Sequence, residues 1–303
     1  MGAGNERTGR ALLYALAGFA LLAIGDAIVK TATSAWPGSA IAALRYLIGT
    51  AGLAALVAVT YGRAGFVAPL PWLQLARGLA VGTATLCFFL SIAFMPLADA
   101  TAIIFTGPLW TAALSALLLR ERPSRAMLVS TLLALAGTLV VLRPNVAALG
   151  LAGLLPLGSA ISMSFLFILN RRVAGLAPVF TMQLLVAAAA TPMLIGFAWA
   201  GHVFGPPALE VGTPSFSVVL RCAVVALTAT TGHWFIFRAT EMAAASTVAP
   251  MTYVQIIVAI AAGWLLFGDR PDAVMLAGVA LIVAGGLWYW RAGRARDIDP
   301  VPD

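Results

Sequence analysis

The chain has 303 residues, of which 62% are hydrophobic and only 10% are charged, and its mean hydropathy is +1.00. Soluble domains have about a quarter of their residues charged, so this composition excludes a soluble globular protein and predicts an all-α integral membrane protein. The net charge of +7 comes from arginine clusters between apolar runs. That distribution favours a role in membrane topology over nucleic-acid binding.

Ten apolar runs follow one another along the chain, each about the 20 residues that a membrane-spanning helix needs. We expect spans at 12–33, 37–60, 71–94, 96–119, 125–142, 150–171, 178–200, 216–239, 243–266 and 273–291. Most connections are short, which places consecutive helices antiparallel and adjacent. The exception is the polar, Pro- and Gly-rich segment 201–215.

The distribution of basic residues predicts the orientation of these spans. With ten spans both termini lie on the same side, and placing them in the cytoplasm puts thirteen basic residues on that face. These are Arg7, Arg10, Arg63, Arg77, Arg120, Arg122, Arg125, Arg171, Arg172, Arg238, Arg291, Arg294 and Arg296. Only Lys30, Arg143, Arg221 and Arg270 fall on the opposite face. This asymmetry follows the positive-inside rule and predicts a multi-pass protein of the cell inner membrane with both termini cytoplasmic.

The phrase LLLRERPSRAML at 117–128 returns as LLFGDRPDAVML at 265–276. At the same offset of 148 residues, Arg122-Pro123 aligns with Arg270-Pro271 and Gly137 with Gly285. Both phrases join the fourth and fifth helices of a five-helix half. Because five is odd, the second half crosses the membrane the other way round. We therefore expect two inverted five-helix repeats at 1–147 and 148–303, an arrangement typical of secondary transporters. Chance similarity of Leu/Ala-rich helices is the alternative.

The chain resembles the EamA-type carriers of the drug/metabolite transporter superfamily, which have ten helices in two halves. The segments that carry this resemblance are ADATAIIFTGPLWTAALSALLLRERPS at 98–124 and ASTVAPMTYVQIIVAIAAGWLLFGDRPD at 245–272. The resemblance covers essentially the whole chain and implies a carrier. Members of the superfamily move amino acids, cationic drugs, nucleotide sugars, S-adenosylmethionine or carboxylates. In length and character the chain is most similar to amino-acid exporters of the YddG type.

Ionisable residues inside spans are candidate functional residues, because charge is costly in a bilayer. Asp26 and Lys30 share a face of the first helix: either Asp26 binds a substrate amine or a proton, or the two form an ion pair near the outer end. Arg45 could bind a substrate carboxylate, or it could cap helix carbonyls or pair with Asp26 or Asp99. His233 has a pKa suited to a proton relay, but a lone histidine is more often a packing residue.

Helix breaks in spans are pointers to transporter binding sites. Gly107 and Pro108 interrupt the fourth span and Pro250 the ninth, and we expect these residues to act as hinges. Polar and aromatic residues lie near them, and we expect a substrate cavity lined by Thr106, Trp110, Tyr253, Gln255, Trp234, Phe165, Ser162 and Arg45. The alternative is that small and hydroxyl residues only allow close helix packing.

Other classes of protein fit the sequence less well. Two isolated histidines and two distant cysteines, Cys87 and Cys222, make neither a usual metal site nor a disulfide framework. P-loop and nucleophile-elbow motifs are absent. We therefore expect no enzyme activity, no cofactor and no metal. A receptor or structural membrane protein is less favoured by the inverted repeat, and a filter-like loop for a channel is absent.

The polar inventory also suggests a substrate class. A single midplane cation suits phosphorylated sugars poorly, and the only deep carboxylate, Asp26, has Lys30 beside it. A zwitterion with an apolar or aromatic side chain fits best, which predicts a carrier of small metabolites, most simply an exporter of neutral or aromatic amino acids. The alternative is a proton-coupled carrier of cationic compounds or of S-adenosylmethionine. A monomer surrounded by the lipid bilayer is sufficient for this reading, and the sequence leaves the oligomeric state open.

Overall fold

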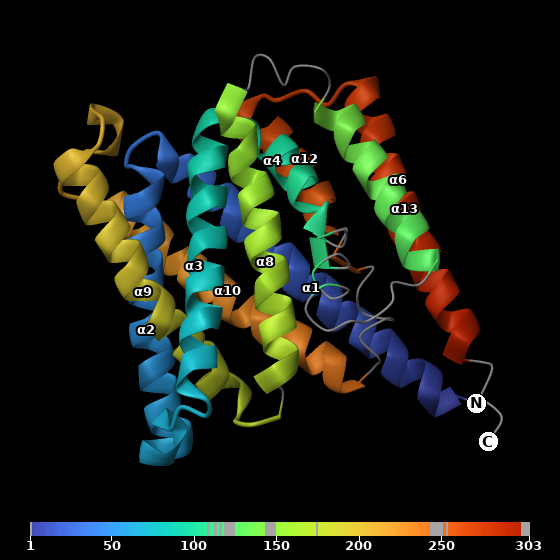
Figure 1. The fold of residues 1–303 in the computed structure, drawn as a ribbon, viewed down its shortest axis with the longest axis horizontal. Coiled ribbons are helices and arrows are strands. Elements are labelled where there is room, and N and C mark those ends of the chain that lie inside the picture. The colour runs from blue at the N-terminus through green and yellow to red at the C-terminus, as the bar shows by residue number, and fades with distance from the viewer. Residues whose placement is uncertain are drawn as a thin grey trace. The chain divides into compact units, whose positions relative to one another are not determined.

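The computed structural model describes residues 2–107, 110, 111, 114, 117, 125–142, 150–173, 175–242, 251, 252 and 254–297. Within these ranges the regular structure is helical (Figure 1). The α-helices are α1 (Gly2–Thr33), α2 (Gly38–Tyr61), α3 (Pro71–Phe94), α4 (Leu97–Ile104), α6 (Arg125–Leu142), α8 (Leu154–Val173), α9 (Val179–Phe204), α10 (Phe216–Met242), α12 (Val254–Phe267) and α13 (Ala273–Asp297). Short 3-10 turns lie at Gly62–Phe66, Gly150–Gly153 and Pro207–Leu209.

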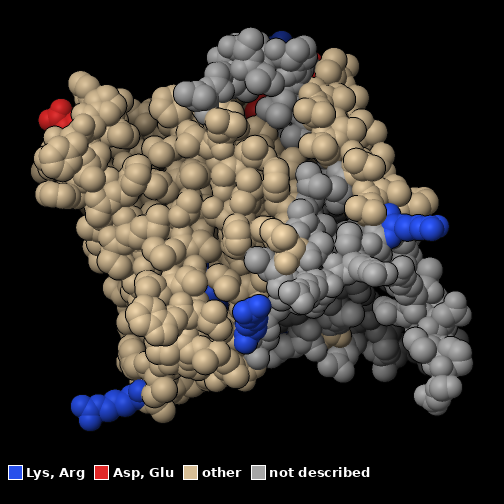
Figure 2. Space-filling model, viewed as in Figure 1, with Lys and Arg blue, Asp and Glu red and all other residues tan. Residues whose placement is uncertain are grey.

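Five of these helical segments are long and apolar enough to cross a membrane. They are Gly9–Thr33, Gly38–Phe66, Pro71–Phe94, Val179–Phe204 and Phe216–Ile236. Shorter apolar stretches lie in α8, α12 and α13. Figure 2 shows a surface on which Lys, Arg, Asp and Glu side chains are sparse, as a lipid-facing surface requires.

Proline and glycine set several helix ends. Pro71 is the first residue of α3, where its missing N–H costs no hydrogen bond, and Pro37 and Pro178 directly precede α2 and α9. At the end of α2, Gly62 has φ 59°, a conformation that a side chain would strain. These residues explain why the predicted bounds of these spans lie within a few residues of the observed ones.

The chain divides into two compact units, and each contains segments from both halves of the sequence. The first unit comprises Met1–Ile24, Pro96–Gly150 and Thr231–Asp303. The second comprises Gly25–Met95 and Leu151–Thr230. The two compact units therefore do not coincide with the two halves of the sequence. Inside each unit, helices of one half of the sequence pack on helices of the other half.

In the first unit, α6 and α13 lie side by side (Figure 1). The two helices approach closely at Gly137, where a Cβ atom would lie 2.5 Å from the carbonyl oxygen of Gly278 and 2.9 Å from the backbone nitrogen of Ile282. Phe105, Ile256 and Ile282 form a core that joins α4, α12 and α13.

Residues aligned at the offset of 148 have matching surroundings in α6 and α13. Leu133 and Leu281 are both half-buried, and Gly137 and Gly285 are both buried. The pairs Ala136 with Ala284 and Leu139 with Leu287 are exposed. The two helices thus present equivalent residues to equivalent environments, which is what a structural repeat requires.

In the second unit, α3 packs against α8 and α9, and α2 packs against α9 (Figure 1). Gly78 lets α3 approach α9 closely, since a Cβ atom there would lie 2.3 Å from Cβ of Ala189. Small residues that bring helix backbones together are typical of membrane helix pairs, where dispersion forces drive association.

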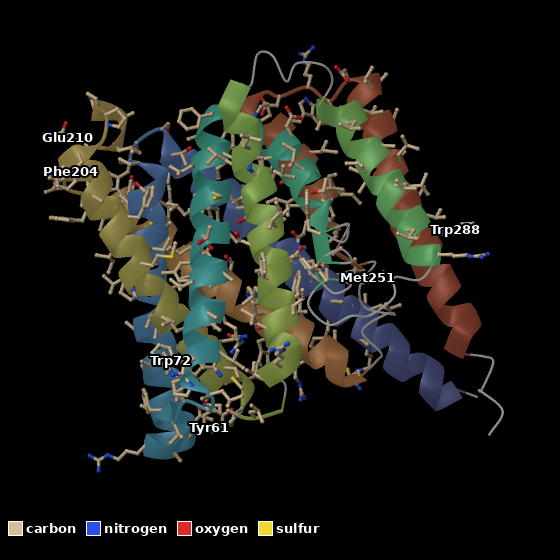
Figure 3. The ribbon with its side chains drawn as sticks, in the orientation of Figure 1. Tyr61, Trp72, Phe204, Glu210, Met251 and Trp288 are labelled. Atoms are coloured by element: carbon tan, nitrogen blue, oxygen red, sulfur yellow. The ribbon has the colours of Figure 1, made fainter. Side chains whose placement is uncertain are left out.

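Aromatic side chains mark both ends of the second unit (Figure 3). Trp72, at the start of α3, is 82% exposed and lies at the same end as Tyr61. Phe204, at the end of α9, is 78% exposed and lies at the other end, near Glu210. Such exposed aromatics are typical of the two membrane–water interfaces, so we infer that the helices of this unit cross the bilayer between them.

Candidate substrate-binding site

Three predicted site residues, Pro108, Pro250 and Tyr253, lie outside the described residues. The remaining predicted site residues are divided between the two compact units. The first unit holds Thr106, Gly107, Trp110, Gln255, Trp234 and His233, and the second holds Asp26, Lys30, Arg45, Ser162 and Phe165.

The structure joins Thr106 and Trp110 directly. Helix α4 ends at Ile104, and Phe105 and Thr106 form a turn just before Gly107. The Thr106 hydroxyl donates to the carbonyl of Ile103 at 2.7 Å and lies 3.2 Å from Nε1 of Trp110, which donates to it. The indole orientation is therefore fixed by the turn, which leaves its ring as an apolar surface held by a hydrogen bond.

Trp234 belongs to an aromatic group on α1 and α10. Its ring meets Tyr14 edge-on at 6.4 Å between centroids and Phe235 at 5.3 Å. The Arg238 guanidinium lies 5.9 Å from the Trp234 ring centroid, within cation–π range. His233 is exposed and Gln255 is half-buried. These side chains supply π-surface and one amide within the first unit.

Ser162 and Phe165 are successive-turn neighbours on α8. Ser162 is half-buried and Phe165 is exposed. Ser159, one turn earlier, is buried and donates to the carbonyl of Ala84 at 2.8 Å, so it serves the contact between α8 and α3.

Asp26 and Arg45 are brought into electrostatic interaction within the second unit, although they lie on different helices. Arg45 lies over two aromatic rings: its Cζ atom is 5.1 Å from the centroid of Tyr46 and 5.2 Å from that of Phe89. Both charges are half-buried. A membrane-embedded acid and base in one unit make a region that complements a zwitterion.

Two other cations of the second unit bind helix ends. Lys30 Nζ donates to the carbonyl of Met95 at 3.2 Å, just after α3. Arg221 donates through an Nη1–H to the carbonyl of Thr31 at 2.7 Å, in the last turn of α1. Both cations lie at helix C-termini, where the unsatisfied carbonyls and the helix dipole favour positive charge. This contact gives Lys30 a structural role.

Sequence reasoning missed the buried cluster around Arg77. The orientation argument counts Arg77 as a charge at the membrane face, but its side chain is only 7% exposed. It donates from Nε–H to Oδ1 of Asn170 at 2.6 Å, from an Nη1–H to Oε1 of Gln74 and to Sδ of Met182 at 3.5 Å. The i, i+3 spacing of Gln74 and Arg77 inside a span is the available signal, but it does not identify the partners on α8 and α9.

No three His, Cys, Asp or Glu side chains come together among the residues that the structure describes. The described polar groups can therefore bind amines, carboxylates and hydroxyls, and the described aromatic groups can bind an apolar moiety.

Comparison with known proteins identifies the class of this chain. The model of the EamA-like transporter family matches residues 9–143 and again residues 150–290. The chain belongs to this family, whose fold is a ten-helix membrane fold of two repeats. It is accordingly a small-molecule transporter and a multi-pass membrane protein, and not an enzyme.

Several curated proteins are similar over most of the chain. The pseudopaline exporter CntI of Pseudomonas aeruginosa is 30% identical over 276 residues, which cover 90% of this chain and 92% of that protein. A riboflavin transporter of Rhizobium johnstonii is 25% identical, covering 76% and 74%. An S-adenosylmethionine uptake transporter of Rickettsia bellii is 26% identical, covering 76% of each. A crystal structure with 22% identity has a TM-score of 0.64 and covers 96% of this chain and 99% of its own, which supports the fold.

Proposed function

We propose that this transporter exports small amino-carboxylate metabolites, most simply neutral or aromatic amino acids, across the inner membrane. The observation that carries the proposal is that one acid, Asp26, and one base, Arg45, both lie half-buried within membrane-spanning helical segments of the second unit. A zwitterion presents an ammonium and a carboxylate, and a half-buried acid and base can each replace part of its hydration.

The remaining polar inventory supports the same substrate. Thr106 and Trp110, which lie before and after Gly107, offer with Gln255 and Trp234 hydroxyl, amide and π-surface in the first unit. Ser162 and Phe165 offer the same kinds of group in the second unit. Aromatic surface of this kind suits the uncharged part of an amino acid with an apolar or aromatic side chain, because it combines apolar area with fixed geometry.

For the mechanism we infer alternating access around a midplane cavity. The repeats, at 1–147 and 148–303, would exchange equivalent packings as the transporter opens to either side, with Gly107, Pro108 and Pro250 as hinges. Both termini would lie in the cytoplasm, as the excess of basic residues on that side favours.

A second candidate is a carrier of S-adenosylmethionine, which the similarity to the Rickettsia uptake transporters supports. S-adenosylmethionine carries the same amino-carboxylate end together with a sulfonium cation, so the Asp26 carboxylate would be its additional partner.

Transport by the purified protein in proteoliposomes tests both candidates. We expect saturable uptake of radiolabelled phenylalanine, leucine or another neutral amino acid, and a pH gradient across the vesicle would show whether protons are coupled to it. Uptake of S-adenosylmethionine without that of neutral amino acids would favour the second candidate. If a cationic dye is transported and no amino acid is, and if Asp26→Asn abolishes that transport, the amino-carboxylate proposal is wrong.

A further inference from the structure

Arg45 differs from the other buried and half-buried cations described in the second unit, Lys30, Arg77 and Arg221, in how its donors are used. Arg77 and Arg221 donate hydrogen bonds to Asn170 and to the carbonyl of Thr31, and Lys30 donates to the carbonyl of Met95. Among the residues that the structure describes, Arg45 makes no hydrogen bond. A guanidinium has five N–H donors, and in a membrane protein each unused donor is costly, so this arrangement calls for a partner.

The Arg45 guanidinium lies within cation–π range of two rings, those of Tyr46 and Phe89. Phe89 is 1% exposed and Tyr46 is 9% exposed, so both rings are fixed in the interior of the unit. Tyr46 is fixed further by a 3.0 Å hydrogen bond between its hydroxyl and Oγ1 of Thr85. These ring contacts use none of the Arg45 N–H groups in a hydrogen bond, so the N–H edge that pairs with a carboxylate through two parallel hydrogen bonds keeps its donors.

Asp26 does not take that edge. It interacts with Arg45 electrostatically, but the two residues form no ion-pair contact within the second unit. A longer separation of this kind stabilises the arginine charge while leaving room for a ligand between or beside the two groups. Arg45 is also half-buried, so part of it remains accessible.

We propose that Arg45, which lies within cation–π range of Phe89 and Tyr46, binds the carboxylate of the carried metabolite through its N–H edge. The carboxylate is then the obligatory recognition group, and the substrate class is carboxylate-bearing metabolites, whatever their side chain. This inference rests on the proposed function, and it adds which residue binds the substrate carboxylate and which ring contacts position that residue.

The test compares phenylalanine with phenylalaninamide, which lacks the carboxylate charge, and with 3-phenylpropionate, which lacks the amine. Each compound competes for uptake of labelled phenylalanine into proteoliposomes containing the full-length protein. We expect phenylalanine and 3-phenylpropionate to compete and the amide to compete at least about tenfold more weakly, the loss of roughly one charge-assisted hydrogen bond. In the variants Arg45→Lys and Arg45→Met, phenylalanine and 3-phenylpropionate should no longer compete more strongly than phenylalaninamide.

Arg221→Lys is the matched control. It changes a guanidinium of the same unit whose donor is already used by Thr31, so the preference for the acid should remain. Variant folding is checked by size-exclusion chromatography. Where a variant transports too slowly to measure, ligand-induced thermal stabilisation of the detergent-solubilised protein gives the same comparison, because a ligand that binds the folded state raises its stability.

The outcomes separate this inference from the proposed function. If amino acids are carried but the amide competes as well as the acid, or if Arg45→Met keeps the preference, the assignment of Arg45 is overturned and the proposed function stands. If no amino acid is carried but other carboxylates, such as 2-oxo acids, are carried in an Arg45-dependent way, the proposed function fails and the assignment stands. If no carboxylate is carried or stabilises the protein, both fail.

Discussion

The Nε–H group of Arg77 donates a 2.6 Å hydrogen bond to Oδ1 of Asn170, joining α3 to α8 across 93 residues of sequence. Because Arg77 is buried and its described partners are the uncharged Asn170, Gln74 and Met182, we infer that it ties these helices together. Its charge is tolerated because neutral acceptors replace part of its hydration.

Replacing Asn170 by leucine should therefore strand a buried guanidinium. We expect a loss of about 2–3 kcal/mol of stability, seen as a lower midpoint in thermal denaturation of the detergent-solubilised protein. The double variant Arg77→Met/Asn170→Leu should recover part of that loss, since apolar residues of similar volume remove the stranded charge. A single variant as stable as the parent would show that the hydrogen bond contributes little to packing.

Gly137→Ala should weaken the pairing of α6 with α13. A Cβ atom at Gly137 would meet backbone atoms of Gly278 and Ile282 at 2.5 and 2.9 Å, and backbone cannot move aside as a flexible side chain can. We expect a cost of about 1–3 kcal/mol in thermal stability. Gly52→Ala in α2 is the control, because no atom lies within 4 Å of its Cβ position. Equal effects of the two substitutions would contradict the close approach of the helices.

Two variants of Tyr46 can separate the contribution of its ring to substrate affinity from that of its hydroxyl group. Tyr46→Phe keeps the ring under Arg45 and removes the hydrogen bond to Thr85, so it should cost about 0.6 kcal/mol of stability and leave the KM for phenylalanine within about twofold. Tyr46→Leu removes the ring and should raise the KM by about threefold to thirtyfold, the range of a partly desolvated cation–π contact. Substrate uptake into proteoliposomes measures both. If the two variants raise the KM equally, the hydroxyl is the important group.

Trp110 should contribute to substrate affinity through its ring. Trp110→Ala removes the indole that Thr106 orients, and we expect the KM for an aromatic substrate to rise by about tenfold. Trp110→Phe should raise it less, because part of the ring surface remains. Trp72→Ala is a suitable control, since Trp72 is exposed at the start of α3. Unchanged affinity in Trp110→Ala would place the cavity elsewhere.

The predicted orientation can be measured with single cysteines. In a protein with Cys87 and Cys222 replaced by alanine, cysteine at Gly212 should react with a membrane-impermeant maleimide in intact cells, whereas cysteine at Ser124 should react only after the membrane is opened. Gly212 tolerates the change, since nothing lies within 4 Å of its Cβ position. The reverse pattern would place both termini outside and invert the export direction.

Much of the helical pattern could be read from the sequence because lipid imposes one strong rule. An apolar run of about 20 residues must satisfy its backbone hydrogen bonds within itself, so it forms a helix wherever proline and charge permit. The predicted runs at 71–94 and 125–142 coincide with α3 and α6. The duplicated Arg-Pro phrase likewise led to the transporter class, which the family match confirms.

Tertiary structure decided what each polar residue does. In the sequence Arg45 and Arg77 both lie within predicted spans, and the orientation argument counts Arg77 as a charge at the cytoplasmic membrane face. Arg77 donates hydrogen bonds to Asn170 and Met182, which lie far from it in the sequence. Arg45 lies within cation–π range of the rings of Tyr46 and Phe89 and makes no hydrogen bond among the described residues. Whether a buried charge binds its own protein or a ligand depends on partners distant in sequence, because only helix packing brings those donors and acceptors within bonding distance.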